Sequence, residues 1–159
     1  MNETNFVYEY SAMLNERQLP VLKETAFYDA GNYADLNSPE KIAEFFNKNF
    51  KMENRGEEYV YMVAFDSKYH VLGIFEISHG TVDASLLGTR ELFLRLLLIG
   101  AVHFAMIHNH PSGNPAPSRD DTLIAGKIKA ASEIMNITFS DNIIIGRGNY
   151  FSFKEERLI

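Results

Sequence analysis

The stretch that decides the fold is AVHFAMIHNHPSGNPAPSRDD, residues 101–121. It opens with an apolar run whose length and composition are typical of a short buried strand. His108 and His110 follow, and Pro111 then ends the strand because proline has no backbone N–H to offer a neighbouring strand. If the strand continues through both histidines, its two-residue period places both imidazoles on one face and Asn109 on the other.

The end of the same stretch offers a third metal ligand. Ser118 is suited to cap a helix, and Asp121 stands at the third helical position, as in a capping box. Alone, this pattern usually indicates only a cap, and Asp120 is expected only to favour the helix N-terminus. Next to two histidines on one strand face, it predicts a metal site. Two His and one Asp leave a tetrahedral zinc ion one position for water, which is the catalytic pattern.

The flanking sequence predicts a single α/β domain. A capping side chain, a proline and an acid at residues 37–40 favour a helix start there. We interpret residues 1–37 as an N-terminal arm or irregular strands packed onto the domain. Periodicity then predicts a helix to about residue 50, a hairpin of strands 59–65 and 69–77, a buried helix at 89–100, a helix at 118–135, and strands at 142–145 and 150–153. This order predicts a mixed β-sheet flanked by helices.

Composition restricts the class of protein. The chain has 159 residues, of which 46% are hydrophobic and 23% charged, as expected of one globular domain. It contains no cysteine, so disulfides and thiolate metal sites are excluded. The formal charge of −6 disfavours general nucleic-acid binding. We expect a cytoplasmic protein with no membrane partner, because the start lacks a signal-peptide pattern and no apolar run approaches the ~20 residues of a bilayer span.

The spacing H-x-H-(x7)-S-x-x-D, filled by His108, His110, Ser118 and Asp121, resembles the signature of the JAB/MPN/JAMM metalloprotease superfamily. The fuller string HNHPSGNPAPSRDD looks like the RadC branch of that superfamily. The resemblance runs from about residue 38 to residue 153. It includes the strand end Phe65-Asp66, GTVDAS at 80–85, Arg90-Glu91 and DNIIIG at 141–146.

The resemblance implies a cytidine-deaminase-like three-layer fold and a RadC-like JAB/JAMM metal-binding domain over residues 38–159. It implies one zinc per chain, held by His108, His110 and Asp121, with water as the fourth ligand. Ser118 would then help to hold the oxyanion of the tetrahedral intermediate. The superfamily also needs an upstream glutamate as general base, and Glu58 stands at that position. Glu57 is adjacent, and a register shift of one residue would exchange the two.

The sequence also departs from the RadC pattern. Such chains usually have Asp-His before the Ile-rich strand, where this chain has Asp141-Asn142. They usually have His-Pro before Arg-Glu, where this chain has Gly88-Thr89. We expect no helix-hairpin-helix region within residues 1–37, because they are too few and lack its glycine hairpins. These departures put auxiliary roles and a DNA-directed role in doubt, but the metal constellation is complete.

Three functions follow from the resemblance. The first is a zinc-dependent hydrolase that uses an activated water on a peptide or isopeptide bond of a protein or peptide substrate. The second is a RadC-like role in DNA repair, as a nuclease or accessory factor, which the net charge does not favour. The third is a non-catalytic scaffold, and the complete ligand set speaks against it.

Overall fold

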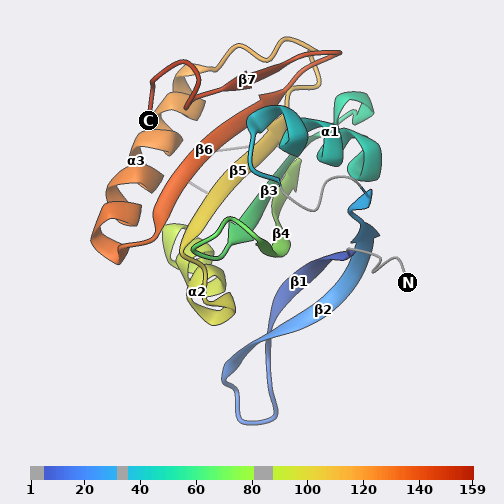
Figure 1. Cartoon of the computed structure of the whole chain (residues 1–159). Helices are drawn as coiled ribbons and strands as arrows, with labels where there is room; N and C mark the ends of the chain where they lie inside the picture. The colour runs from blue at the N-terminus through green and yellow to red at the C-terminus, as the bar shows by residue number, and fades with distance from the viewer. Residues whose placement is uncertain (1–5, 32–35, 81–87) are drawn as a thin grey trace.

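A computed structural model describes residues 6–31, 36–80 and 88–159 of the chain. Within these residues, seven strands form one sheet in the order β2-β1-β4-β3-β5-β6-β7 (Figure 1). The neighbours β1/β4 and β5/β6 are parallel, and the others are antiparallel, so the sheet is mixed. The strands are β1 Phe6–Leu14, β2 Pro20–Asp29, β3 Glu58–Phe65, β4 Val71–Gly80, β5 His103–Asn109, β6 Thr138–Ile145 and β7 Tyr150–Ser152.

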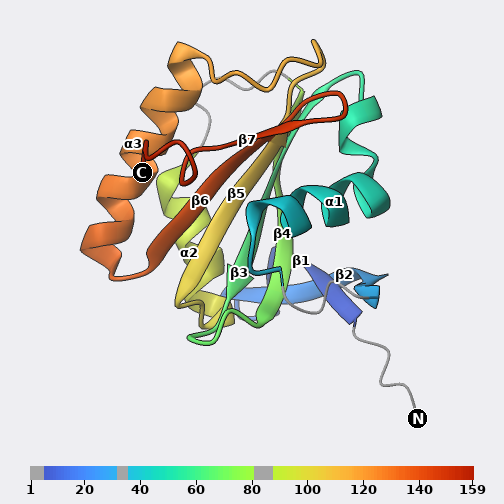
Figure 2. The same ribbon diagram turned by 45° about the horizontal axis from the view of Figure 1, so that its top comes forward.

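Helices cover both faces of the sheet and give three layers. Helix α1, Pro39–Phe50, lies on one face, and α2, Thr89–Ile99, and α3, Arg119–Met135, lie on the other (Figures 1 and 2). The buried residues accordingly divide into a cluster around α1 and a cluster around α2 and α3. The structure confirms the predicted single α/β domain with a mixed sheet flanked by helices. Of the GTVDAS segment, residues 81–85 lie outside the described residues.

The start of α1 follows the predicted capping pattern. The Ser38 side chain accepts a hydrogen bond from the Lys41 backbone N–H, and Pro39 stands in the first turn. Five buried residues on the sheet-facing side of the helix anchor it: Ile42, Ala43, Phe45, Phe46 and Phe50. The predicted hairpin is also present, as the antiparallel pair β3 and β4.

The N-terminal segment is more regular than predicted. We interpreted it as an arm or irregular strands, but β1 and β2 form a long antiparallel pair with one bulge between Glu9 and Tyr10. The Asn15 side chain accepts hydrogen bonds from two backbone N–H groups and fixes the connecting turn. The pair joins the main sheet through a parallel contact of Glu9 with Ile74. Such long-range pairing leaves no local signal in the sequence.

Helix α2 is less buried than predicted. The sequence is apolar on nearly all sides, yet Leu97 is 55% exposed and Leu98 is 39% exposed. A helix against a sheet can bury only the stripe that faces it. In α2 that stripe is Leu92, Phe93 and Leu96. No helix in the described ranges is long and apolar enough to cross a membrane.

The core on the α1 side provides the first prediction. Phe46 is fully buried and packs its ring against Phe50 and Tyr61. Phe46→Ala should lower the free energy of unfolding by about 3–5 kcal/mol, because it removes buried apolar surface and leaves a cavity. Urea denaturation measures this change. The control is Phe27→Ala, because Phe27 is 60% exposed and should change stability by no more than about 0.5 kcal/mol. Equal losses in the two variants would contradict the assigned core.

Candidate metal centre

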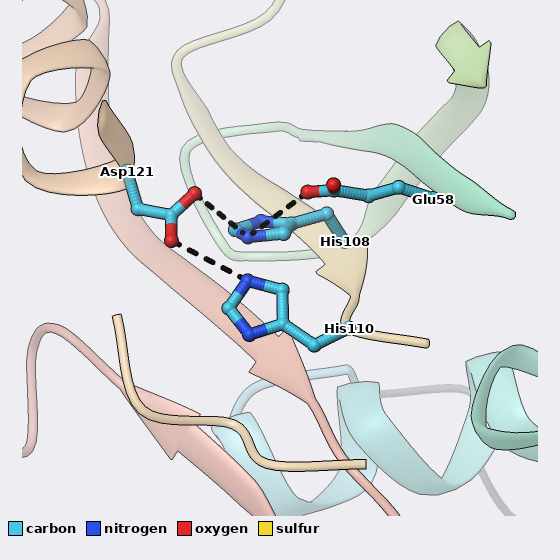
Figure 3. A group of neighbouring side chains, drawn as sticks. All are labelled: Glu58, His108, His110 and Asp121. Carbon is cyan, nitrogen blue, oxygen red and sulfur yellow. Dashed lines mark ion pairs between the residues drawn. The ribbon is translucent and has the colours of Figure 1, made fainter. Parts of the chain in front are cut away.

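Four ligand-type side chains converge where β5 ends, β3 begins and α3 begins (Figure 3). They are Glu58, His108, His110 and Asp121, and each offers one ligand atom within 4.8 Å of all the others. Glu58 begins β3, and Asp121 lies in the first turn of α3. His108 lies near the end of β5, and His110 follows that strand directly. The structure therefore brings together the predicted metal ligands and the predicted base.

The strand geometry places both histidines on one face, as predicted. His108 pairs with Val60 of β3, and Val60 belongs to the core under α2 and α3. Two residues later, the His110 N–H donates to the Ile145 carbonyl of β6, so the strand direction continues past the end of the β3 ladder. Asn109 lies on the opposite face, where its side chain contacts the start of β3.

The third ligand is fixed by the start of α3. The Ser118 hydroxyl accepts the Asp121 N–H at 3.1 Å, and the Asp121 carboxylate accepts the Ser118 N–H at 2.6 Å. This is the predicted capping box. Asp121 is 5% exposed, and its carboxylate cannot turn away without breaking the cap. The cap thus orients the carboxylate toward the histidines.

The ligand atoms lie close enough together to share one ion. The distance from Nε2 of His108 to Oδ1 of Asp121 is 3.2 Å, and the distance from Nε2 of His110 to Oδ2 of Asp121 is 3.3 Å. Ligand atoms of a tetrahedral zinc site lie about 3.3 Å apart, given bonds of roughly 2.0 Å. In the part of the chain that the structure describes, the buried Nε2 of His108 has no hydrogen-bond partner. An orphaned ligand atom in this position suits a metal ion.

Electrostatics keep Asp121 in its ligand form. Burial alone would raise the pKa of this carboxyl, but the imidazoles of His108 and His110 and the contact with Ser118 hold it well below its usual range. The hydrogen bond to Asp121 in turn raises the pKa of His110, against the effect of burial. Asp121 is therefore an anion at neutral pH, which is the form that binds a cation.

A loop carbonyl fixes the orientation of His110. Its Nδ1 lies 2.8 Å from the carbonyl oxygen of Asn114. Because a carbonyl only accepts hydrogen bonds, Nδ1 must carry a proton. In the neutral ring the lone pair is therefore on Nε2, the atom that faces Asp121. Gly113 shapes the loop, with a φ of +81° that favours glycine. Its carbonyl also accepts the Arg147 N–H at 2.9 Å.

Glu58 and Glu57 occupy different surroundings. Oε1 of Glu58 is 3.9 Å from Nε2 of His108, and the Glu58 side chain points into the cluster (Figure 3). Burial raises the pKa of Glu58, while the two histidines partly oppose that shift. Glu57 is exposed, and it meets the site only through its carbonyl, which accepts a hydrogen bond from Asn109. The structure places Glu58 beside the ligands, and its role as general base stays a prediction.

Ser118 lies at the rim of the cluster. It is exposed, and its hydroxyl oxygen is engaged by the Asp121 N–H. Its predicted second role, at an oxyanion, is not tested by this contact. The remaining histidines take other partners: His70 contacts Asp66, His79 contacts Glu76, and His103 stacks on Tyr69.

Three asparagines near the site were not predicted to contribute to it. Asn114 orients His110, and Asn109 contacts the backbone on both sides of Glu58. Asn142, one of the departures from the RadC pattern, is 5% exposed and lines a small cavity with His108 and Asp121. The other half of that departure, Asp141, bonds to the Ser152 hydroxyl at 2.6 Å. The contact of Asn114 with His110 spans four residues and could be inferred from the sequence. The other contacts join residues too far apart in the sequence to be predicted from their spacing.

Comparison with known proteins gives a consistent result. The model of the RadC-like JAB domain family matches residues 36–158. Similar proteins include a UPF0758 protein of Trichlorobacter lovleyi, which is 38% identical over 124 residues, and one of Thermotoga maritima, which is 36% identical over 124 residues. A UPF0758 protein of Geobacter sulfurreducens is 30% identical over 151 residues.

These alignments cover most of this chain but only part of each relative. The alignment with the Trichlorobacter lovleyi protein covers 78% of this chain and 53% of the relative. The corresponding values are 74% and 56% for the Thermotoga maritima protein, and 95% and 61% for the Geobacter sulfurreducens protein. The chain thus spans little more than half the length of the relatives it matches.

The converging ligands predict one bound transition-metal ion per chain. Asp121→Ala should abolish stoichiometric binding, because it removes the carboxylate that both histidines face. Metal analysis after dialysis against zinc measures the content of each variant. The matched control is Asp120→Ala, which alters the same helical turn but removes an exposed carboxylate and should keep the metal. Equal metal content in the two variants would contradict the assignment.

The loop that orients His110 gives a further prediction. A Cβ at Gly113 would lie 3.2 Å from Cβ of Arg147 on a backbone that disfavours side chains. Gly113→Ala should therefore shift the Asn114 carbonyl and weaken metal affinity by about 10- to 100-fold, as loss of an outer-shell partner does. Competition with a chelating dye measures the affinity.

The control for this change is Gly126→Ala. Gly126 lies within α3, and a Cβ there would meet nothing within 4 Å. This variant should keep metal affinity and gain about 1 kcal/mol of stability from helix propensity. If Gly113→Ala bound metal as tightly as Gly126→Ala, the loop would have no part in orienting His110.

Proposed function

Because this chain belongs to the RadC-like JAB domain family, we propose that it is a zinc-dependent hydrolase that cleaves peptide or isopeptide bonds. One observation carries the proposal: two imidazoles and a carboxylate converge at 3.2 and 3.3 Å, and a second carboxylate stands next to them at 3.9 Å. Three ligands and an adjacent base are what hydrolysis by an activated water requires.

Among metal ions, zinc best matches this set of donor atoms. The chain has no cysteine, and the cluster offers two neutral imidazole nitrogens and one carboxylate. This composition is that of catalytic zinc sites, which keep a position open, and we propose one zinc per chain. Zinc, when bound, lowers the pKa of water from ~15.7 to about 7 and polarises a carbonyl oxygen.

Glu58 is proposed as the general base. Its carboxylate stands at the edge of the cluster, 23% exposed, so it faces both the ligands and solvent. Burial raises the pKa of this carboxyl, and the two histidines partly oppose that shift. In the proposed reaction Glu58 takes a proton from the attacking water, holds it at its carboxylate, and gives it to the leaving amine.

Ser118 is proposed to donate to the oxyanion that forms at the attacked carbonyl. Its oxygen accepts the Asp121 N–H, so the hydroxyl keeps its own hydrogen for a second bond. A donor already held by a helix cap needs little reorganisation when charge develops, and this favours the transition state. The capping box would therefore place both a metal ligand and an oxyanion donor.

The direction of substrate access follows from how the cluster is exposed. The side chains of His108 and Asp121 are 7% and 6% exposed, whereas those of His110 and Glu58 are 14% and 23% exposed. The open side of the site is thus the side of the base and of the second histidine. We propose that an extended segment of a protein or peptide reaches the site from there.

The alternative, a RadC-like role in DNA repair as nuclease or accessory factor, has less support. The formal charge of the chain is −6, and a nucleic-acid site needs positive charge near the phosphates. A scaffold without activity would have no use for the complete ligand set. The hydrolase therefore remains the favoured proposal.

The proposed base can be separated from the ligands by mutation. Glu58→Gln should lower the hydrolysis rate by about 100-fold or more, because an amide cannot accept the proton. It should keep the metal, since Glu58 is not proposed as a ligand. Turnover of a substrate found by screening quenched peptides and isopeptide-linked peptides measures the rate, and metal analysis accompanies it. Glu57→Gln is the control and should keep full activity. A fully active Glu58→Gln protein would overturn the mechanism.

A further inference from the structure

We propose that Asn109 is a positioning residue that sets the distance of Glu58 from the metal ligands. This inference deepens the proposed hydrolase function and rests on it. Asn109 stands between the two histidines in sequence, but its side chain is bonded to the backbone at the start of β3. It therefore acts through the backbone of β3, not through the metal.

The contacts of Asn109 flank Glu58 on both sides. Its Oδ1 accepts the Tyr59 N–H at 2.8 Å, and its Nδ2 donates to the Glu57 carbonyl at 3.0 Å. The side chain is 1% exposed, so water cannot easily replace these two bonds. Both backbone groups that Asn109 binds belong to the peptide units next to Glu58.

The Asn109 side chain bonds to β3 at the point where the backbone pairing of β3 with β5 ends. The last backbone pair between β3 and β5 is Val60 with His108. One step further, a side-chain amide fills the space in which the next backbone contact would lie. On its other edge β3 is held by β4, where Glu58 pairs with Gly80. The start of β3 is therefore fixed from both sides, and on the β5 side the spacer is Asn109.

This spacing decides between two roles for Glu58. A carboxylate inside the ligand shell would stand about 3.3 Å from the other ligand atoms and would occupy the open position. Oε1 of Glu58 is instead 3.9 Å from Nε2 of His108, beyond the 3.2 Å of Asp121 Oδ1. We infer that the Asn109 spacer keeps Glu58 back as a base instead of a fourth ligand.

The hydrogen-bonding groups of asparagine explain why this residue suits position 109. The two backbone groups need one acceptor and one donor, and a side-chain amide offers both in one plane. Aspartate would keep the acceptor for Tyr59 but would set an anion against the Glu57 carbonyl. Leucine has a similar shape and offers neither bond. The two variants therefore remove one or both contacts without a large change in volume.

The test is a crystallographic comparison of the full chain after addition of zinc. The proteins are the wild type, Asn109→Leu and Asn109→Asp, and the distances measured join the Glu58 carboxylate to zinc and to Nε2 of His108. Both variants should keep one zinc per chain. Their Glu58 carboxylate should move by about 1 Å or more, a displacement that costs roughly 100-fold when it misplaces a catalytic group.

A matched control removes a buried hydrogen bond elsewhere. Ser152→Ala deletes the 2.6 Å bond to Asp141, at a residue that is 2% exposed. It should lower the melting temperature as Asn109→Leu does but leave Glu58 in place. If Asn109→Leu did not fold, Asn109→Asp would decide, because it keeps the bond to Tyr59.

The outcomes separate the two proposals. An unmoved Glu58 in the variants would overturn the role of Asn109 while leaving the hydrolase proposal intact. A wild type that takes up no zinc would overturn the hydrolase proposal. In that case the distance from Glu58 to His108 in the metal-free crystals still shows whether Asn109 sets the position of β3.

Discussion

The site depends on the Asp121 carboxylate, which belongs both to the cap of helix α3 and to the candidate ligand cluster. Oδ2 of Asp121 closes the cap of α3 by accepting the Ser118 N–H, and the two oxygens of the same group face the two histidines at the end of β5 and just beyond it. A helix start without a capping acceptor would be less stable, and a metal site without this anion would lose its only negative ligand. The same carboxylate caps the helix and faces the histidines, so the start of α3 is held in a fixed position relative to the end of β5. The fold therefore holds these candidate ligands together at one point.

The groups around the cluster work through the backbone. His110 is oriented by the Asn114 carbonyl, and the peptide units on both sides of Glu58 are held by the Asn109 side chain. Outer contacts of this kind fix tautomer and direction, which the ligands cannot do for themselves. The candidate ligands gather at the start of α3, and Asn109 reaches the start of β3 from the end of β5.

The sequence predicted those parts of the site that follow from local periodicity. The strand period placed His108 and His110 on one face, and the capping box placed Asp121 on α3. Glu58 was predicted only from a family resemblance, because nothing in the spacing of residue 58 relates it to residue 108. The contact of Asn109 with the start of β3 spans about fifty residues and follows only from strand pairing. The N-terminal strands were not fully predicted for the same reason, because their place beside β4 depends on contacts between residues far apart in the sequence. The exposure of leucines on α2 likewise depends on which side of the helix the sheet covers.

The central claim is that His108, His110 and Asp121 form a zinc site. X-ray absorption spectroscopy on the zinc-loaded protein tests it directly, because the spectrum reports the ligand atoms and their distances. We expect two imidazole nitrogens at about 2.0–2.1 Å and oxygen ligands at about 2.0–2.2 Å, with the nitrogen signal lost when both histidines are replaced. A protein that retains no zinc after dialysis, or one whose bound zinc shows no imidazole nitrogens, would contradict this account.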